Sequence, residues 1–262
     1  MSSPKILADY LEIGINTIIE PSAVIRGING NAKRIIIGDN VYIGESVQII
    51  CDDFEMGDYG KIHHHTNIHG YKPCKIGHNI WVGQYCILDT IGGLTIGNNC
   101  AVGAQTQLWS HIKFGDTLEG CRFLSDKPLS IGDDVYFSGK CVVSPVNIQD
   151  KAMALAGSVI TKDMEFNTIY AGVPAMSVTD KLGYQFDTIS VDDKYKKMIE
   201  YLSHSGVNTS KIKIVRERSE AILEDNISYF IVATREYTKK LSDEEIFFMK
   251  FLLPEKAKFT PL

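Results

Sequence analysis

The chain has 262 residues, of which 44% are hydrophobic and 23% charged, and its formal net charge is −5. This composition is that of a globular protein and excludes an intrinsically disordered chain. The acidic balance and the lack of a basic run also exclude a protein that binds a nucleic-acid backbone, because such binding needs clustered Lys and Arg.

Residues 1–18 carry no clear repeat and no secretory signal pattern, and we expect them to form an N-terminal lead-in. No stretch of the chain approaches the roughly 20 apolar residues that span a bilayer. We therefore expect a soluble, cytoplasmic protein that is not a membrane protein.

A six-residue unit recurs from about residue 19 to residue 173, and we expect residues 19–184 to form one domain. In each unit an aliphatic residue is followed by Gly, and a small residue stands at the fifth position. Such a repeat predicts a stack of similar structural units in place of a conventional layered domain. Clear copies are IGDNVY (37–42), IGESVQ (43–48), IGHNIW (76–81), VGQYCI (82–87), IGNNCA (96–101), VGAQTQ (102–107) and IGDDVY (131–136).

The aliphatic residues that begin these units fall into three columns. Three units therefore make one coil, and the members of a column should stack inward from one coil to the next. An amphipathic helix would show apolar spacings of three and four, which these segments lack. The columns are Ile37, Ile76, Ile96, Ile131 and Ile148; Ile43, Ile62, Val82, Val102, Phe137 and Ala154; and Ile49, Ile68, Leu88, Leu108, Val143 and Ile160.

Two departures from the period indicate where extra residues leave the coil. Ile76 and Ile96 are 20 residues apart, which puts the extra pair Gly92-Gly93 at a corner. Ile96 and Ile131 are 35 residues apart, so a loop of about 17 residues, 112–128, should project just after His111.

Residues 185–262 lack the repeat and predict a small α+β region. Helices are expected at 192–204 and 242–253, and strands at 211–216 and 227–237. Ser242 should cap the second helix, with Glu245 completing a capping box.

The cysteines form no CxxC pair that would suggest a zinc or redox site. Cys86, Cys100 and Cys141 occupy slots where the repeat places a small residue. We interpret them as buried core residues.

Four segments together resemble the maltose, galactoside and polysaccharide O-acetyltransferases of the hexapeptide-repeat family. They are GGLTIGNNCAVGAQTQLWSH, KPLSIGDDVYFSGKCVVSPV, AGSVITKD and YAGVPA. The resemblance implies a mainly β fold, a left-handed parallel β-helix shaped as a triangular prism. It also implies a homotrimer with sites between subunits, acetyl-CoA as the acyl donor, and no metal.

By the same resemblance, His111 is the general base that deprotonates an acceptor hydroxyl or amine for direct attack on the thioester. The family order places the oxyanion donor at Gly139. No Cys or Ser stands in a setting that demands a covalent acyl-enzyme, although Cys121 on the loop stays open as a nucleophile.

The family pattern also implies the residues that bind coenzyme A. Gly139 and Ala156 would hold the pantetheine arm, with Gly157 beside them, and Thr161 and Lys162 would lie near the nucleotide. Tyr136 occupies a slot that often holds Trp. The chain departs from the pattern at Ser144-Pro145-Val146, where a corner is one residue short, and at Met176, where a basic residue is usual.

The acceptor site is expected at Tyr85, Asp89 and Trp109, which the columns bring near His111, although trimer packing would also explain them. The resemblance favours a sugar acceptor, and the additional region 185–262 favours a cell-surface polysaccharide or its precursor. Three alternatives stay open: a sugar N-acetyltransferase acting on a nucleotide-linked amino sugar, a zinc enzyme like the γ-class carbonic anhydrases using His63-His64-His65 with His69 and His78, and a noncatalytic scaffold.

Overall fold

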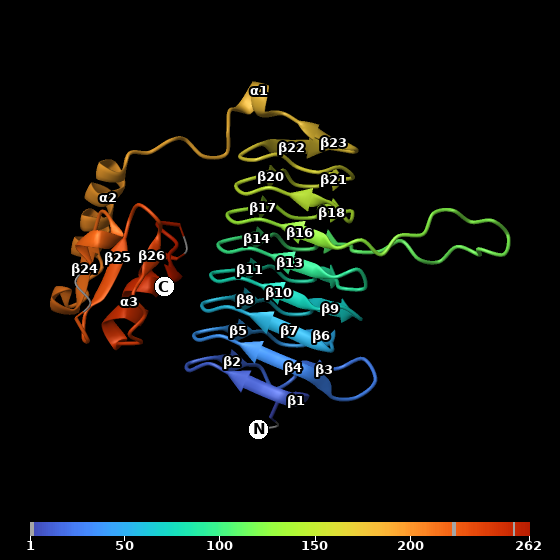
Figure 1. Cartoon of the computed structure of the whole chain (residues 1–262), viewed down its shortest axis with the longest axis horizontal. Coiled ribbons are helices and arrows are strands. Elements are labelled where there is room, and N and C mark those ends of the chain that lie inside the picture. The colour runs from blue at the N-terminus through green and yellow to red at the C-terminus, as the bar shows by residue number, and fades with distance from the viewer. Residues whose placement is uncertain (1–2, 222–223, 254) are drawn as a thin grey trace. The chain divides into compact units, whose positions relative to one another are not determined.

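The computed structural model describes residues 3–221, 224–253 and 255–262. The chain divides into two compact units, one up to Phe186 and the other from Asp187 onward. The first unit is a parallel β-helix in which three sheets surround one core and successive coils stack on one another (Figure 1).

Face 1 of this β-helix carries the first predicted column. Its inward residues Ile37, Met56, Ile76, Ile96, Ile131 and Ile148 lie in register, so the predicted column is confirmed, with Met56 as an added member. The strands are β4 (Ala32–Ile37), β7 (Asp53–Met56), β10 (Cys74–Ile76), β13 (Leu94–Ile96), β16 (Leu129–Ile131) and β19 (Asn147–Ile148).

Face 2 carries the second column, from Ile43 to Ala154, in the predicted register. Its strands are β2 (Ile18–Ile19), β5 (Tyr42–Ile43), β8 (Lys61–Ile62), β11 (Trp81–Val82), β14 (Ala101–Val102), β17 (Tyr136–Phe137), β20 (Met153–Ala154) and β22 (Ile169–Gly172). β22 turns back as a hairpin into β23 (Ala175–Ser177), which α1 (Thr179–Leu182) follows.

Face 3 carries the third column, from Ile49 to Ile160, again in the predicted register. Its strands are β3 (Val24–Arg26), β6 (Gln48–Cys51), β9 (Asn67–Gly70), β12 (Ile87–Asp89), β15 (Gln107–Leu108), β18 (Val142–Val143) and β21 (Val159–Ile160).

The expectation that residues 1–18 only lead into the repeat is wrong. β1 (Lys5–Ile13) pairs through its first residues with β3 and through its last residues with β4, so it belongs to faces 3 and 1 at once. A strand that runs through a corner without a tight turn needs no Gly, and this is why β1 lacks the repeat signature.

The three columns form a continuous apolar core. Cys86, Cys100 and Cys141 are at most 1% exposed, which confirms their interpretation as core residues. Burial also raises the pKa of each of these thiols.

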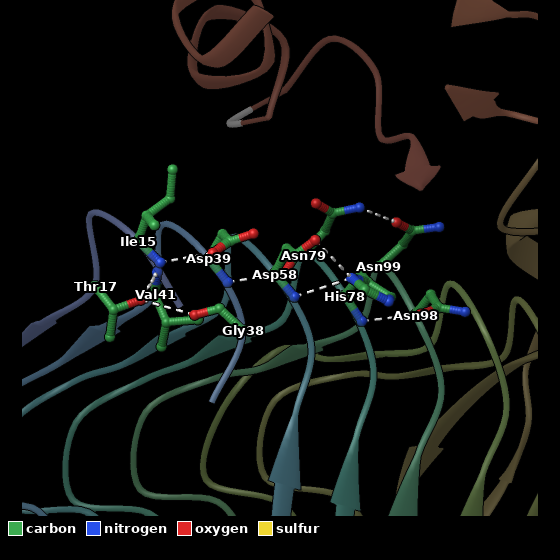
Figure 2. Close-up of polar contacts among 10 residues, drawn as sticks. All are labelled: Ile15, Thr17, Gly38, Asp39, Val41, Asp58, His78, Asn79, Asn98 and Asn99. Carbon is green, nitrogen blue, oxygen red and sulfur yellow. Dashed lines mark hydrogen bonds and ion pairs between the residues drawn. The ribbon is translucent and has the colours of Figure 1, made fainter. Parts of the chain in front are cut away.

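The corner between faces 1 and 2, which we name the ladder corner, is held by a column of side chains (Figure 2). Each side chain accepts a hydrogen bond from a backbone N–H of the preceding coil. The N–H of Asp58 donates to Nδ1 of His78 at 2.9 Å, and the N–H of His78 donates to Oδ1 of Asn98 at 2.9 Å. The acceptors are Asp39, Asp58, His78, Asn98, Asp133 and Asp150.

We name the other two corners by what they carry. The glycine corner, between faces 2 and 3, includes Gly139 and Gly157, both at positive φ. The loop corner, between faces 3 and 1, is where the segment 112–128 leaves the coils (Figure 1).

In the residues that the structure describes, the second unit is a four-stranded sheet with two α-helices and two short 3₁₀ turns. Its elements are α2 (Val191–His204), η1 (Thr209–Lys211), β24 (Ile212–Val215), η2 (Arg218–Glu220), β25 (Ser228–Ile231), β26 (Glu236–Tyr237), α3 (Asp243–Leu252) and β27 (Thr260–Pro261). The two helices and the first strand lie where the sequence predicts them, and the predicted strand 227–237 is split by a turn into β25 and β26. Among the residues that the structure describes, no helix is long and apolar enough to cross a membrane.

The capping prediction for α3 is half right. The hydroxyl of Ser242 accepts from the N–H of Glu245 at 3.2 Å, as expected. The carboxylate of Glu245, however, is buried and accepts from the N–H groups of Lys240 and Leu241 and from the Ser228 hydroxyl. Glu245 therefore ties the helix start to β25 and does not close a capping box.

Candidate active site

His111 lies at the loop corner, three residues after the buried Leu108 of β15. Its Nδ1 atom is 2.8 Å from Oδ2 of Asp89, which ends β12 one coil earlier. The side chain of His111 is 21% exposed and that of Asp89 only 5%. The imidazole is thus held from inside the protein while part of it faces outward, as a base that meets an external substrate requires.

Asp89 is too buried for a sugar to contact it freely, although the sequence placed it among the acceptor-binding residues. Its Oδ2 also accepts from the backbone N–H of Ser110 at 2.9 Å and from the Ser110 hydroxyl at 2.5 Å. Asp89 is buried at a corner, where its carboxylate faces the protein. The column arithmetic did place it one coil from His111, and that neighbourhood is what the structure shows.

Trp109 lies beside His111, with ring centroids 6.0 Å apart and the rings at 66°. Its indole N–H donates to Oε1 of Gln107 at 3.1 Å, so the indole is fixed with part of its surface exposed. Trp109 can therefore offer an aromatic face to a ligand next to the imidazole.

Tyr85 is not part of this group. It lies at the glycine corner before β12, whereas Asp89 lies at the other end of that strand. Its ring stacks on His65 with centroids 4.9 Å apart. In one chain the structure separates Tyr85 from the other two predicted acceptor residues.

The loop 112–128 begins as a short antiparallel pair. Ile112 and Ser125 exchange two backbone hydrogen bonds of 2.7 and 2.8 Å. The Lys113 ammonium is 2.9 Å from the Asp126 carboxylate, and this hydrogen bond lowers the pKa of Asp126. The loop base is therefore fixed next to His111.

The part of the loop beyond its base exposes large apolar side chains. Phe114 is 102% exposed, Leu118 92% and Phe123 79%. Such side chains usually meet another surface.

The residues predicted to bind coenzyme A form two groups. At the glycine corner, the N–H of Gly157 donates to the carbonyl of Gly139 at 3.0 Å, so these two residues stack in adjacent coils with Ala156 next to them. Tyr136 lies on face 2, three residues before Gly139, and is 37% exposed. A Cβ at Gly157 would meet no atom within 4 Å, so this edge is open to a ligand.

Thr161 and Lys162 form the second group. They are exposed and follow β21 at the loop corner, the same corner that carries His111 two coils earlier. The width of face 3, roughly 13 Å for four strand residues, separates this corner from the glycine corner. One chain therefore does not bring the Gly139 group next to His111.

The histidine cluster at 63–65 is bound into aromatic packing. His63 lies between Tyr42 and Trp81, with ring centroids 6.1 and 5.1 Å away, and burial lowers the pKa of its imidazole. Over the described part of the chain, no group of three or more His, Cys, Asp or Glu side chains is arranged to hold a metal ion.

Comparison with known proteins finds the same repeat. Residues 128–162 match the family described as the hexapeptide repeat of succinyl-transferase. The bifunctional protein GlmU of Listeria monocytogenes serotype 4a (strain HCC23) is 27% identical over 197 residues, covering 66% of this chain and 40% of that protein. GlmU of Thermotoga sp. (strain RQ2) is 30% identical over 179 residues, covering 59% and 37%. This chain thus spans well under half the length of these relatives.

Among solved structures, the polySia specific acetyltransferase NeuO has a TM-score of 0.54 with 17% identity, covering 78% of this chain and 92% of that one. At this identity the likeness concerns the fold. Together with the matching repeat, it confirms the predicted left-handed β-helix and the predicted hexapeptide repeat.

Proposed function

We propose that this chain, which has the hexapeptide repeat and the left-handed β-helix fold, transfers an acetyl group from acetyl-CoA to a sugar. The observation that carries the proposal is the His111–Asp89 pair, with Nδ1 and Oδ2 2.8 Å apart at the base of the projecting loop. A histidine oriented by a buried carboxylate is the usual arrangement of a general base that activates a hydroxyl.

In the proposed reaction, His111 takes the proton of the acceptor hydroxyl as its oxygen attacks the thioester carbonyl. The C–O bond forms, the C–S bond breaks, and the proton on His111 passes to the departing thiolate. The negative charge that develops on the carbonyl oxygen needs a fixed donor, and the backbone N–H of Gly139 is our candidate.

The glycine corner supports the binding of the pantetheine arm. Gly139, Ala156 and Gly157 carry no side chain larger than a methyl group, so a ligand can approach the backbone closely. Tyr136 would flank the arm from face 2. Thr161 and Lys162, both exposed, would contact the nucleotide end, where the ammonium of Lys162 suits a phosphate.

The separation of the two groups supports a site built by two chains in a homotrimer. The Gly139 group of one chain would complete the site at the His111 of the next. Exposed aromatic residues on face 2, including Trp81 at 39% and Tyr136 at 37%, and the apolar loop side chains supply surface for such packing. Light scattering of the purified protein tests this, and a mass of one or two chains contradicts it.

We place the acceptor next to Trp109, whose partly exposed ring could stack on a pyranose 6.0 Å from the imidazole. The acceptor would be a polysaccharide of the cell surface or its precursor, acylated on oxygen. The reaction would take place in the cytoplasm, where buried free thiols such as Cys86 and Cys141 stay reduced.

The test is the release of CoA thiol from acetyl-CoA with a panel of neutral, acidic and amino sugars and oligosaccharides. His111→Ala should lower turnover by about 10²–10⁴-fold, the usual contribution of a general base. His204→Ala, which removes an exposed histidine from the second unit, serves as the matched control. Near wild-type turnover of a folded His111→Ala protein, or no thiol release with any acceptor, contradicts the proposal.

A further inference from the structure

We propose that Ser110 is a positioning residue which, together with the backbone amide of Gly92, fixes the tautomer of His111 and leaves Nε2 free to accept a proton. The inference rests on the proposed role of His111 as the base. It adds residues that the repeat pattern did not identify, and it gives a purpose to the extra pair Gly92-Gly93.

Ser110 is fully buried between two coils. Its hydroxyl accepts from the N–H of Gly92 at 2.8 Å and lies 2.5 Å from Oδ2 of Asp89. Its backbone N–H donates to the same oxygen at 2.9 Å. Ser110 therefore contacts Asp89 twice, and Asp89 in turn contacts His111.

The direction of each hydrogen bond follows from the backbone. An amide N–H can only donate, so the Ser110 oxygen acts as an acceptor toward Gly92, and its single proton remains available for Asp89. Oδ2 of Asp89 then receives one donor that cannot reverse its role, the Ser110 N–H, and faces the Ser110 hydroxyl as a second donor. An ionised carboxylate, which offers acceptors and no donor, matches both contacts.

The imidazole of His111 takes its tautomer from this carboxylate. Since Oδ2 of Asp89 only accepts, Nδ1 of His111, 2.8 Å away, must carry the proton of that hydrogen bond. In a neutral imidazole the other nitrogen then holds a lone pair, so Nε2 is the basic atom. The Ser110 amide, together with the hydroxyl that the Gly92 amide contacts, thus supports the proton arrangement that the chemistry needs.

Gly92 is suited to this role because a side chain does not fit there. A Cβ at residue 92 would collide with the carbonyl oxygens of Ser110 and Lys127. Only glycine lets the corner approach the loop base closely enough for its N–H to reach the Ser110 hydroxyl.

The tautomer can be measured without any mutation. In protein labelled with ¹⁵N-histidine, at a pH where the ring is neutral, the nitrogen shifts and two-bond couplings of His111 should show a protonated Nδ1 and a bare Nε2. His111→Gln identifies the signal by its loss. A proton on Nε2 overturns the inference, whatever the activity of the enzyme.

Ser110→Ala tests the contribution of the hydroxyl. We expect kcat to fall roughly 10–100-fold, the range found for residues that orient metal-bound histidines, with an unchanged KM for acetyl-CoA and a population of the Nε2–H tautomer. Ser110→Thr, which keeps the hydroxyl, should recover part of kcat and the Nδ1–H signature.

The matched control is Thr66→Val. The Thr66 hydroxyl is also buried, donates to the carbonyl of Gly83 at 2.8 Å and accepts from the N–H of Cys86 at 3.2 Å, at the glycine corner. Its loss should lower thermal stability but not kcat or the His111 tautomer. A Ser110→Ala protein that behaves like Thr66→Val contradicts the positioning role. An active His111→Ala protein instead contradicts the proposed function and leaves the tautomer measurement valid.

Discussion

The ladder corner and the loop corner use the same kind of contact for different ends. At both, a side-chain acceptor on one coil takes a backbone N–H from its neighbour. The ladder corner repeats the contact along the β-helix, with Asp58, His78 and Asn98 in consecutive positions (Figure 2). At the loop corner, the N–H of Gly92 donates to Ser110, whose own two donors converge on Asp89.

The difference is in what the acceptor does next. Asp, Asn and His are interchangeable at the ladder corner because each offers an acceptor atom one bond beyond Cγ. The residues of the loop corner cannot be exchanged in this way, since His111 depends on the charge of Asp89 and Asp89 is contacted by the Ser110 hydroxyl. We infer that the regular ladder corner stabilises the coils. The loop corner, where Gly92-Gly93 break the period, instead positions the residues that would act in catalysis.

The largest effect is expected when the same Asp→Asn substitution is made at both corners and kcat is compared. Asp89→Asn keeps the size of the side chain but replaces the carboxylate by an amide, whose NH₂ group can donate to Nδ1 of His111 and reverse its tautomer. By analogy with triads in which the acid is made neutral, we expect kcat to fall by about 10²–10⁴-fold.

Asp133→Asn is the control for that experiment. Asp133 accepts from the N–H of Asn98 at 2.6 Å, a role that Asn98 itself fills for the preceding coil. The variant should keep its activity, with a change in unfolding free energy within about 0.5 kcal/mol. Equal losses of kcat in the two variants would mean that the loop corner has no special role in catalysis.

A smaller effect is expected from His78, the one histidine of the ladder. His78→Ala removes the acceptor that the N–H of Asp58 uses, and we expect a loss of about 1–2 kcal/mol in unfolding free energy. His78→Asn restores an acceptor at the same distance from the backbone and should be near neutral. Denaturant unfolding of both variants checks this, and an Asn variant as unstable as the Ala variant would show that the ladder acceptor is not what matters.

The sequence predicts the coils well because the repeat is local. Each aliphatic-Gly unit sets one strand and one corner, so adding units gives the register of Ile37 to Ile148 without knowledge of the fold. β1 was not predicted because it passes a corner without a turn and therefore lacks the Gly of the repeat. The same arithmetic placed Asp89 next to His111, since columns give the neighbour one coil away.

The repeat does not predict which side chains are buried at a corner or which way they point. Tyr85 and Asp89 are four residues apart in the sequence yet lie at opposite edges of face 3, and only the positions of the corners separate them. The role of Ser110 has one trace in the sequence, the longer period at Gly92-Gly93. The two residues added at Gly92-Gly93 lengthen the loop corner, and an insertion that brings a backbone amide to a buried hydroxyl shows up in the sequence only as a longer period.

The smallest effect is expected from thiol modification, which compares the coils with the loop. Burial raises the pKa of Cys51, Cys74, Cys86, Cys100 and Cys141, and thiolates are the reactive form, so these five should react slowly in the folded protein. Cys121, on the loop, is only partly buried and should be alkylated first, with little effect on stability. Peptide mapping after brief treatment with iodoacetamide checks the order, and Cys121→Ser should remove the fast phase. A coil cysteine that reacts before Cys121 would show that the coils open more readily than their continuous core predicts.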